Sequence, residues 1–367
     1  GKYKGKNLIL ITAEGFSPYA VKKDITPTLY KMYEEGFKFK NFYTPSWGVS
    51  TSDGEYVACT GLIPKEGIWS FYKSSKNYMP FAMGNQLKKE GYETKAYHNH
   101  YFDYYFRHES HPNLGYTYKG LGNGLNVTET WPESDLEMIE LTVPEYIDMQ
   151  PFHIYYMTIS GHLQYNFYGN YIAAKNKDLV ENLMYSDNVK AYLACNIELD
   201  KAMEKLIQEL EKKGIAEDTL IAISPDHYPY GLTLAEISEL ANKEIKANFE
   251  LYKGVFLLWS KGMVPVEIDK VCSSLDIIPT LSNLMGLEYD SRLLMGRDIL
   301  SDCEPLVVFS DRSWITDKAF FNGKTGEISS LNGENTDAYI EEIEKTVKDK
   351  FKYSAMILET NYYNILK

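Results

Sequence analysis

The chain has 367 residues, of which 44% are hydrophobic and 24% charged, so it holds enough apolar side chains for a large core. Its formal net charge of −13 argues against broad binding to nucleic acid or to an anionic membrane surface, because both are polyanions. A phosphorylated substrate stays compatible with this charge, since it needs only local positive charge. The four cysteines form no CxxC pair, which argues against a structural zinc site.

The predicted strands are short apolar, β-branched runs. In chain order they are Asn7–Thr12, Lys38–Tyr43, Thr94–His98, His153–Ile159, Thr219–Ser224, Val255–Trp259 and Leu306–Phe309. Helical patterns lie between most of them, at Pro27–Glu35, Asn85–Glu90, Leu193–Lys213 and Ser273–Leu284. This alternation predicts an α/β fold with a mostly parallel central sheet flanked by helices.

The C-terminal part has a different pattern. Trp314–Phe321 and Glu327–Leu331, separated by a turn with two glycines, predict a β-hairpin, and Thr336–Thr360 predicts one long helix. We therefore expect a main α/β domain over residues 1–304 and a smaller C-terminal lobe over residues 305–367 that packs on it.

No apolar run of about 18 residues exists, and the start of the sequence does not have the pattern of a signal peptide. The first residue is Gly1 rather than methionine, and a buried strand is predicted within a few residues. We expect that an upstream anchor or signal segment is missing from this sequence.

Polar and ionisable residues follow four of the predicted strands. Glu14 follows the first, His98, His100 and later Arg107 the third, His162 the fourth, and Asp226 with His227 the fifth. In an open α/β sheet ligands bind beyond the carboxyl ends of the strands, so these residues predict a shared cleft.

Glu14, Asp226 and His227 have the oxygen and imidazole donors that suit a divalent cation such as Mn, Zn or Mg. Taken alone, an Asp-His pair is more often a helix cap or a surface loop. The position of Glu14 after a neighbouring strand favours the metal site.

A nucleophile is expected near Ser50–Glu55. Ser52 and Glu55 have the spacing of a capping box, which predicts that a helix begins here, and a helix N-terminus stabilises an anion. A threonine or serine hydroxyl at that place, next to a divalent metal, can lose its proton near neutral pH. The alternative is that Thr51 and Ser52 only cap the helix, and that Asp53 and Glu55 serve the helix start.

Several segments, in this order, resemble the alkaline phosphatase/sulfatase superfamily, and specifically the extracellular catalytic domain of lipoteichoic acid synthases. The matching segments are Lys6–Ile9 with Glu14, Thr26–Leu29, Glu35–Phe39, Thr51–Tyr56, Phe106-Arg107, Ser160–His162, Asp226–Tyr228, Asp276–Leu281 and Gly296–Asp298. They cover about residues 6–300.

The resemblance implies one divalent metal ion, usually Mn, with Mg or Zn as alternatives. Its implied ligands are Glu14, Thr51, Asp226 and His227. It also implies that Thr51 is the nucleophile.

The resemblance further implies that Arg107 and His162 contact the phosphoglycerol group, with His162 as an acid or base. Tyr105 stands where the family often has tryptophan, and His100 where the synthases have aspartate, so a different head group is an alternative. His98 either lines the site or is a buried, hydrogen-bonded imidazole.

The expected function is therefore metal-dependent transfer of phosphoglycerol from a glycerophospholipid to a polymer acceptor, at the outer face of the cytoplasmic membrane. Alternatives are a phosphoethanolamine transferase or phosphodiesterase of the same superfamily, and a catalytically silent domain that binds polymer or lipid head groups. A formylglycine sulfatase is not expected, because Cys59 is followed by Thr-Gly-Leu rather than by the x-Pro-x-Arg that such enzymes need. No nucleic-acid partner is expected.

Overall fold

The centre of the molecule is an eight-stranded, mostly parallel sheet. The computed structural model describes residues 1–332 and 336–367. The strand order is β4-β3-β5-β1-β6-β7-β2-β8, and every neighbouring pair is parallel except the two that β7 makes. The strands are β1 (Asn7–Ala13), β2 (Phe37–Tyr43), β3 (Glu93–Tyr101), β4 (Thr117–Leu121), β5 (Phe152–Met157), β6 (Thr219–Pro225), β7 (Leu257–Trp259) and β8 (Val266–Ser273). The predicted fold class is confirmed.

Strand β1 lies inside the sheet and all seven of its residues are buried. Because side chains alternate across a sheet, Leu8 and Leu10 pack into one hydrophobic cluster while Ile9 and Ile11 pack into another. Burial on both faces explains why this strand is an unbroken apolar run in the sequence.

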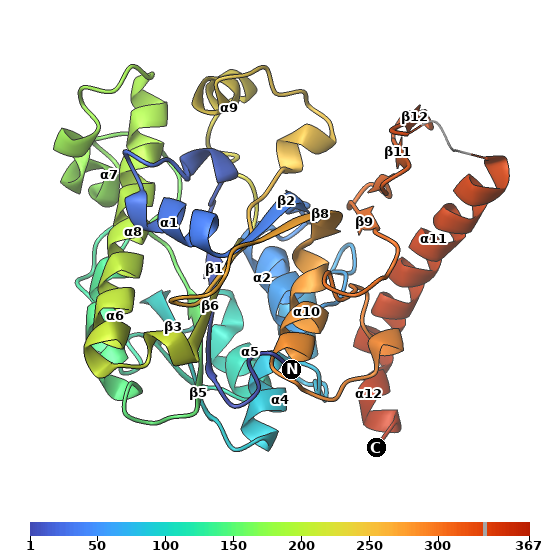
Figure 1. Cartoon of the computed structure of the whole chain (residues 1–367), viewed down its shortest axis with the longest axis horizontal. Helices are drawn as coiled ribbons and strands as arrows, with labels where there is room; N and C mark the ends of the chain where they lie inside the picture. Colours follow the sequence, from blue (N-terminus) through green and yellow to red (C-terminus); the bar gives the residue numbers. More distant parts are fainter. Residues whose placement is uncertain (333–335) are drawn as a thin grey trace.

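Helices cover both faces of the sheet (Figure 1). On one face lie α1 (Pro27–Glu35), α6 (Asp135–Thr142), α7 (Tyr171–Lys175), α8 (Asp187–Lys213) and α9 (Leu234–Ala241). On the other lie α2 (Ser50–Thr60), α3 (Ser70–Ser74), α4 (Met83–Lys89), α5 (Arg107–Asn113) and α10 (Ile277–Leu284). Among the described residues, no helix has both the length and the apolar character that crossing a membrane would require.

Short 3-10 helices supplement this frame. They are Pro18–Ala20, Tyr104–Phe106, Val143–Glu145, Lys177–Leu179, Ala216–Asp218, Phe249–Tyr252, Ser274–Asp276 and Ser291–Leu293. The second lies in the connection between β3 and α5, at the carboxyl edge of the sheet.

The C-terminal part forms a smaller antiparallel sheet and a long helix. The sheet contains β9 (Val307–Val308), β10 (Trp314–Ile315), β11 (Ala319–Phe321) and β12 (Ile328–Ser330). The helices are α11 (Asp337–Thr360) and α12 (Tyr362–Ile365), drawn in red at the edge of the molecule in Figure 1. The expected hairpin is present as β11 and β12, but Trp314–Phe321 is not one strand, because it turns back on itself between β10 and β11.

Helix α11 packs on the larger part of the molecule through its second half. The Ser354 hydroxyl accepts a hydrogen bond from the Ile63 N–H, and the Asn77 amide donates to the Leu358 carbonyl, both at buried positions. We propose the domain boundary at residues 304 and 305, because the small sheet begins just after it, at β9.

Two strands and parts of two helices differ from the sequence prediction. Strands β4 and β8 were not predicted, since β8 alternates exposed charged residues with apolar ones at the edge of the sheet. Helix α8 begins at Asp187, before the expected Leu193, and the expected helix Ser273–Leu284 is a 3-10 turn followed by α10.

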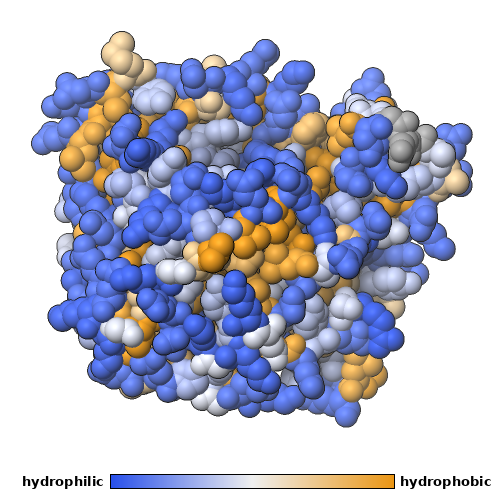
Figure 2. Space-filling model, viewed as in Figure 1, coloured by the Kyte–Doolittle hydropathy of each residue, from blue (hydrophilic) through white to orange (hydrophobic). Residues whose placement is uncertain are grey.

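Figure 2 shows a mainly hydrophilic face with hydrophobic side chains gathered near its middle.

Candidate metal centre and active site

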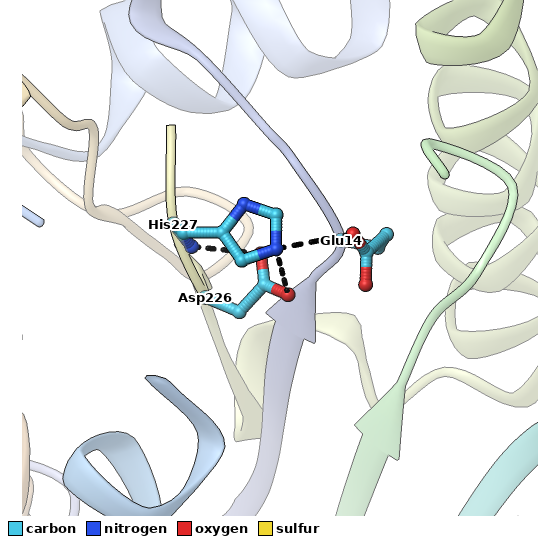
Figure 3. Close-up of side chains that lie close together, drawn as sticks. All are labelled: Glu14, Asp226 and His227. Carbon is cyan, nitrogen blue, oxygen red and sulfur yellow. Dashed lines mark hydrogen bonds and ion pairs between the residues drawn. The ribbon is translucent and has the colours of Figure 1, made fainter. Parts of the chain in front are cut away.

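Three ionisable side chains meet where two neighbouring strands end. Glu14 directly follows β1, and Asp226 and His227 directly follow β6, which pairs with β1 over its whole length. The His227 Nε2 atom lies 3.3 Å from Glu14 Oε1 and 3.2 Å from Asp226 Oδ2 (Figure 3). All three residues are buried, and one ligand atom from each lies within 4.8 Å of the others. Two carboxylates and an imidazole so arranged form a candidate metal site.

Thr51 completes this cluster from a different element. It is the second residue of α2, and its hydroxyl donates a hydrogen bond of 3.1 Å to Glu14 Oε2. The Thr51 Oγ1 atom also lies 3.2 Å from His227 Nε2. Four potential ligands thus converge at the first turn of a helix, where free backbone N–H groups favour an anion.

The cluster fits a divalent cation by two physical criteria. Glu14 Oε1 and Asp226 Oδ2 are buried oxygen atoms without a hydrogen-bond partner among the described residues. Burial and the charge of Glu14 raise the pKa of Asp226 to about 8. Burial opposes the charge of His227, but the two carboxylates still raise the pKa of His227 to about 9. At Glu14 burial opposes the charge of His227, but the pKa of Glu14 is still lowered to about 2, so Asp226 and His227 retain protons beside an ionised carboxylate. A cation would replace these protons and neutralise the carboxylates.

Two glycines permit the close approach of these elements. A Cβ atom on Gly54 would lie 2.1 Å from the Asp226 carbonyl oxygen, and one on Gly161 would lie 2.1 Å from the Glu14 carbonyl oxygen. Each distance is far below van der Waals contact, so only glycine lets α2 and the segment after β5 pack against these backbone atoms. Gly54 therefore sets how near Thr51 comes to Asp226.

The start of α2 differs from the prediction. The helix begins at Ser50, its N-cap is Val49, and no side chain caps it. The capping box of Ser52 and Glu55 was wrong, although Asp53 does serve the helix start, since its Oδ2 accepts a hydrogen bond from the Val49 N–H at 2.8 Å.

Glu55 instead binds Arg107. Arg107 begins α5, is 1% exposed, and donates from Nε to Glu55 Oε2 at 2.9 Å. Its Nη1 donates to the Tyr104 carbonyl at 3.3 Å, whereas Nη2 has no hydrogen-bond partner among the described residues. One end of the guanidinium is thus left available for a phosphate oxygen.

The connection that leads to Arg107 has a strained backbone. Tyr105 and Phe106 have φ values of 55° and 57°, in the left-handed region that costs a residue with a Cβ roughly 1–2 kcal/mol. The Tyr105 ring centroid lies 5.4 Å from the Arg107 guanidinium carbon. Tyr105, expected to line the site, therefore packs on Arg107 rather than standing apart from it.

His162 and His100 both contact an aromatic ring that the sequence analysis did not single out. The Trp131 ring centroid is 4.7 Å from that of His162 and 5.3 Å from that of His100. His162 Nδ1 lies 2.6 Å from the Leu163 carbonyl oxygen, so Nδ1 carries the proton, and Nε2 has no hydrogen-bond partner among the described residues. His100 Nδ1 lies 2.8 Å from Glu133 Oε1, a carboxylate that is itself buried.

His98 is a buried imidazole within β3. Its Nδ1 lies 2.9 Å from the Met157 carbonyl oxygen, and Nε2 has no partner among the described residues. Burial and the nearby Arg107 hold the pKa of His98 well below its ordinary value, which keeps the ring neutral. The strand continues to Tyr101, so His98 and His100 lie inside it rather than after it.

The structure thus brings Glu14, Thr51, Asp226 and His227 into direct contact. The other expected site residues, His98, His100, Tyr105, Arg107 and His162, make no hydrogen bond to this cluster among the described residues.

Sequence reasoning missed Tyr230 as well as Trp131 and the role of Glu55. The Tyr230 ring centroid lies 4.4 Å from that of His227, and its hydroxyl is 2.8 Å from Ser50 Oγ. In the sequence, the position of Tyr230 three residues after His227 was the one feature that could have pointed to it as a site residue.

Comparison with known proteins gives a consistent result. The model of the sulfatase family matches residues 6–287. The lipoteichoic acid synthase-like protein YvgJ of Bacillus subtilis is 26% identical over 355 residues, which is 89% of this chain and 56% of that protein. The lipoteichoic acid synthase of Staphylococcus saprophyticus is 26% identical over 360 residues, 88% of this chain and 52% of the synthase. The chain therefore spans about half the length of the curated relatives it matches.

The fold is also found in a solved structure. The lipoteichoic acid synthase LtaP from Listeria monocytogenes superposes with a TM-score of 0.83 at 22% sequence identity, and the match covers 98% of this chain and 93% of the other. The similarity includes the C-terminal lobe, because the match covers almost all of the chain.

Proposed function

This chain belongs to the sulfatase family, and we propose that within it the chain is a metal-dependent phosphoglycerol transferase with Thr51 as its nucleophile. The observation that carries the proposal is the position of the Thr51 hydroxyl, 3.1 Å from Glu14 Oε2 and 3.2 Å from His227 Nε2 at the start of α2. The similarity to lipoteichoic acid synthases supports phosphoglycerol as the transferred group.

Glu14, Asp226, His227 and the Thr51 oxygen would hold the cation, for which we propose Mn, with Mg or Zn as the alternatives for this donor set. When bound, a divalent cation would lower the pKa of the Thr51 hydroxyl and neutralise charge on the phosphate.

In the first half-reaction, Thr51 Oγ1 attacks the phosphorus of a glycerophospholipid. The hydroxyl proton leaves toward Glu14 Oε2, which already accepts its hydrogen bond. A bond forms between Thr51 and phosphorus, and the bond from phosphorus to the diacylglycerol oxygen breaks. The free Nη2 of Arg107 binds an equatorial phosphate oxygen and stabilises its charge. The product of this half-reaction is phosphoglycerol bound covalently to Thr51.

His162 is proposed as the acid and base. Because its Nδ1 is bound to a carbonyl oxygen, Nε2 can give a proton to the departing diacylglycerol oxygen and take one from the acceptor hydroxyl. In the second half-reaction the acceptor oxygen attacks phosphorus and the bond to Thr51 breaks. A cell-envelope polymer is the proposed acceptor, and the outer face of the cytoplasmic membrane the proposed location.

A phosphoethanolamine transferase or phosphodiesterase is the second candidate. His100, held on the buried Glu133 and flanked by Trp131, is the observation that favours it, because these groups would suit a head group other than glycerol. A catalytically silent binding domain fits less well, since a complete set of four ligands converges on one point.

Mass spectrometry of the intact protein tests the proposal. After incubation with phosphatidylglycerol and Mn, a phosphoglycerol adduct is expected on Thr51 and on no other residue. A phosphoethanolamine adduct formed with phosphatidylethanolamine would support the second candidate. Absence of any adduct together with absence of turnover would favour the silent domain.

A further inference from the structure

A network of buried polar groups lies directly behind the proposed site. Its centre is Glu55, which is 0% exposed and uses both carboxylate oxygens. Oε2 accepts from Arg107 Nε at 2.9 Å, while Oε1 accepts from the Tyr155 hydroxyl at 3.1 Å and lies 3.0 Å from His111 Nε2. The Tyr155 hydroxyl also lies 2.9 Å from Thr12 Oγ1 in β1.

This network connects the two elements that carry the proposed nucleophile and the proposed phosphate ligand. Thr51 and Glu55 are four residues apart in α2, and Arg107 and His111 are four residues apart in α5. Residues at this spacing lie on the same side of a helix. One carboxylate therefore holds α5 against α2 at two points, one helical turn away from Thr51.

From this geometry we propose that Glu55 is a positioning residue: it holds Arg107 in register with Thr51 and so aligns the guanidinium with the reacting phosphate. The inference rests on the proposed function, because it takes Arg107 to be the phosphate ligand.

The hydrogen bond between Glu55 Oε2 and Arg107 Nε supports the positioning role of Glu55. By occupying Nε, Glu55 leaves the Nη2 end of Arg107 free, so its carboxylate fixes the orientation of the group without filling its phosphate-binding edge. Glu55 also opposes relaxation of the connection before Arg107, where Tyr105 and Phe106 have left-handed backbone conformations.

The test is a double-mutant cycle between Glu55→Asp and Arg107→Met. Aspartate keeps the negative charge but withdraws the carboxylate by one methylene group, so Arg107 must shift. A misplacement of this size costs transfer on the order of 100-fold in kcat/KM. In the Arg107→Met background the same Glu55→Asp change is expected to cost less than about 3-fold, because the group that it positions is absent.

Tyr155→Phe is the matched control, since it removes one hydrogen bond to Glu55 and leaves the contact with Arg107 intact. We expect it to lower the melting temperature but to change kcat/KM less than about 3-fold. The metal content of all variants should match wild type, because Glu14, Asp226 and His227 lie outside the network. If Glu55→Asp fails to fold, Glu55→Gln takes its place, because it removes the negative charge that holds Arg107 Nε, and the same dependence of the loss on the Arg107 background is expected.

Two results would overturn the inference. One is full activity of Glu55→Asp, and the other is an equal loss in wild-type and Arg107→Met backgrounds, which would show a structural role alone. If the wild-type protein transfers no head group from any phosphodiester, the proposed function fails instead. The two failures are therefore distinguishable.

Discussion

Two turns of the same helix show two uses of a buried carboxylate. Around Thr51, at the first turn of α2, the oxygens Glu14 Oε1 and Asp226 Oδ2 have no hydrogen-bond partner among the described residues. One turn later, both oxygens of Glu55 are bound by side chains of the chain itself. Burial is nearly complete in both regions, so the difference lies in the supply of partners. A buried carboxylate with one oxygen that accepts no hydrogen bond is available to a ligand, whereas a carboxylate with both oxygens bonded supports its neighbours.

The largest expected effect on activity comes from a substitution in the first of these two regions. Thr51→Ala should lower turnover of a phosphodiester by at least about 10⁴-fold, because it removes the nucleophile and leaves the Glu55 network intact. The melting temperature should change little. Release of the head group measured by chromatography checks the first result and circular dichroism the second. Retained turnover would contradict the assignment of Thr51.

A second prediction concerns the packing that brings the first turn to the cluster. Gly54→Ala would place a Cβ 2.1 Å from the Asp226 carbonyl oxygen, so α2 must move. We expect activity to fall on the order of 100-fold and stability by about 1–3 kcal/mol. Gly48→Ala is the matched control, because its nearest contact would be 4.0 Å, and it should behave like wild type. Equal behaviour of the two variants in metal binding and activity would argue against the close packing.

A third prediction uses the pH dependence of the metal-free protein. The pKa values of Asp226 and His227 are raised to about 8 and about 9, above their ordinary values of 3.8 and 6.5. Stability from these protonated groups is fully present below the ordinary pKa values of 3.8 and 6.5 and is lost as the pH rises from there through the raised values. Urea unfolding should therefore show stability falling by roughly 1–3 kcal/mol between about pH 7 and pH 9.

Added Mn should flatten this dependence, because a cation replaces the protons. Asp226→Asn should reduce the slope without metal and lose the response to Mn. An unchanged slope in wild-type protein with saturating Mn would count against a cation at this cluster.

The smallest expected effect on activity and stability comes from substitution of Asp53, which lies between Thr51 and Glu55 in α2. Asp53→Asn keeps an oxygen that can accept the hydrogen bond from the Val49 N–H, so stability should change by less than about 1 kcal/mol. Activity should stay within about twofold, since Asp53 contacts neither Arg107 nor the cluster. A large loss of activity would show that the first turn of α2 is more tightly coupled to the reaction than its contacts indicate.

Much of the central sheet could be predicted because its strands are buried on both faces and are therefore unbroken apolar runs. Strand β8 was missed because an edge strand alternates apolar and charged residues. Glu14, Thr51, Asp226 and His227 could be selected as candidates since three of them directly follow strands and a family motif marks Thr51. Their meeting at one point depends on the register of β1 and β6, which no local pattern encodes.

The role of Glu55 could not be predicted, because its partners Arg107 and Tyr155 are 52 and 100 residues away. Its local spacing from Ser52 pointed instead to a cap, and the helix begins earlier than that pattern requires. Gly54 and Trp131 were missed for a related reason, since a close approach and a ring between two histidines exist only in three dimensions.

The left-handed pair Tyr105 and Phe106 has a consequence for engineering. Redesign guided by folding stability alone would favour glycine, which has no Cβ atom, or asparagine, which adopts the left-handed conformation more readily than tyrosine or phenylalanine, at these two positions. The resulting protein should have a higher melting temperature. Its connection between β3 and α5 would be more mobile, and Arg107 would lose its contact with the Tyr105 ring. A higher melting temperature obtained at these two positions would therefore be accompanied by a less fixed position of Arg107 and by lower activity.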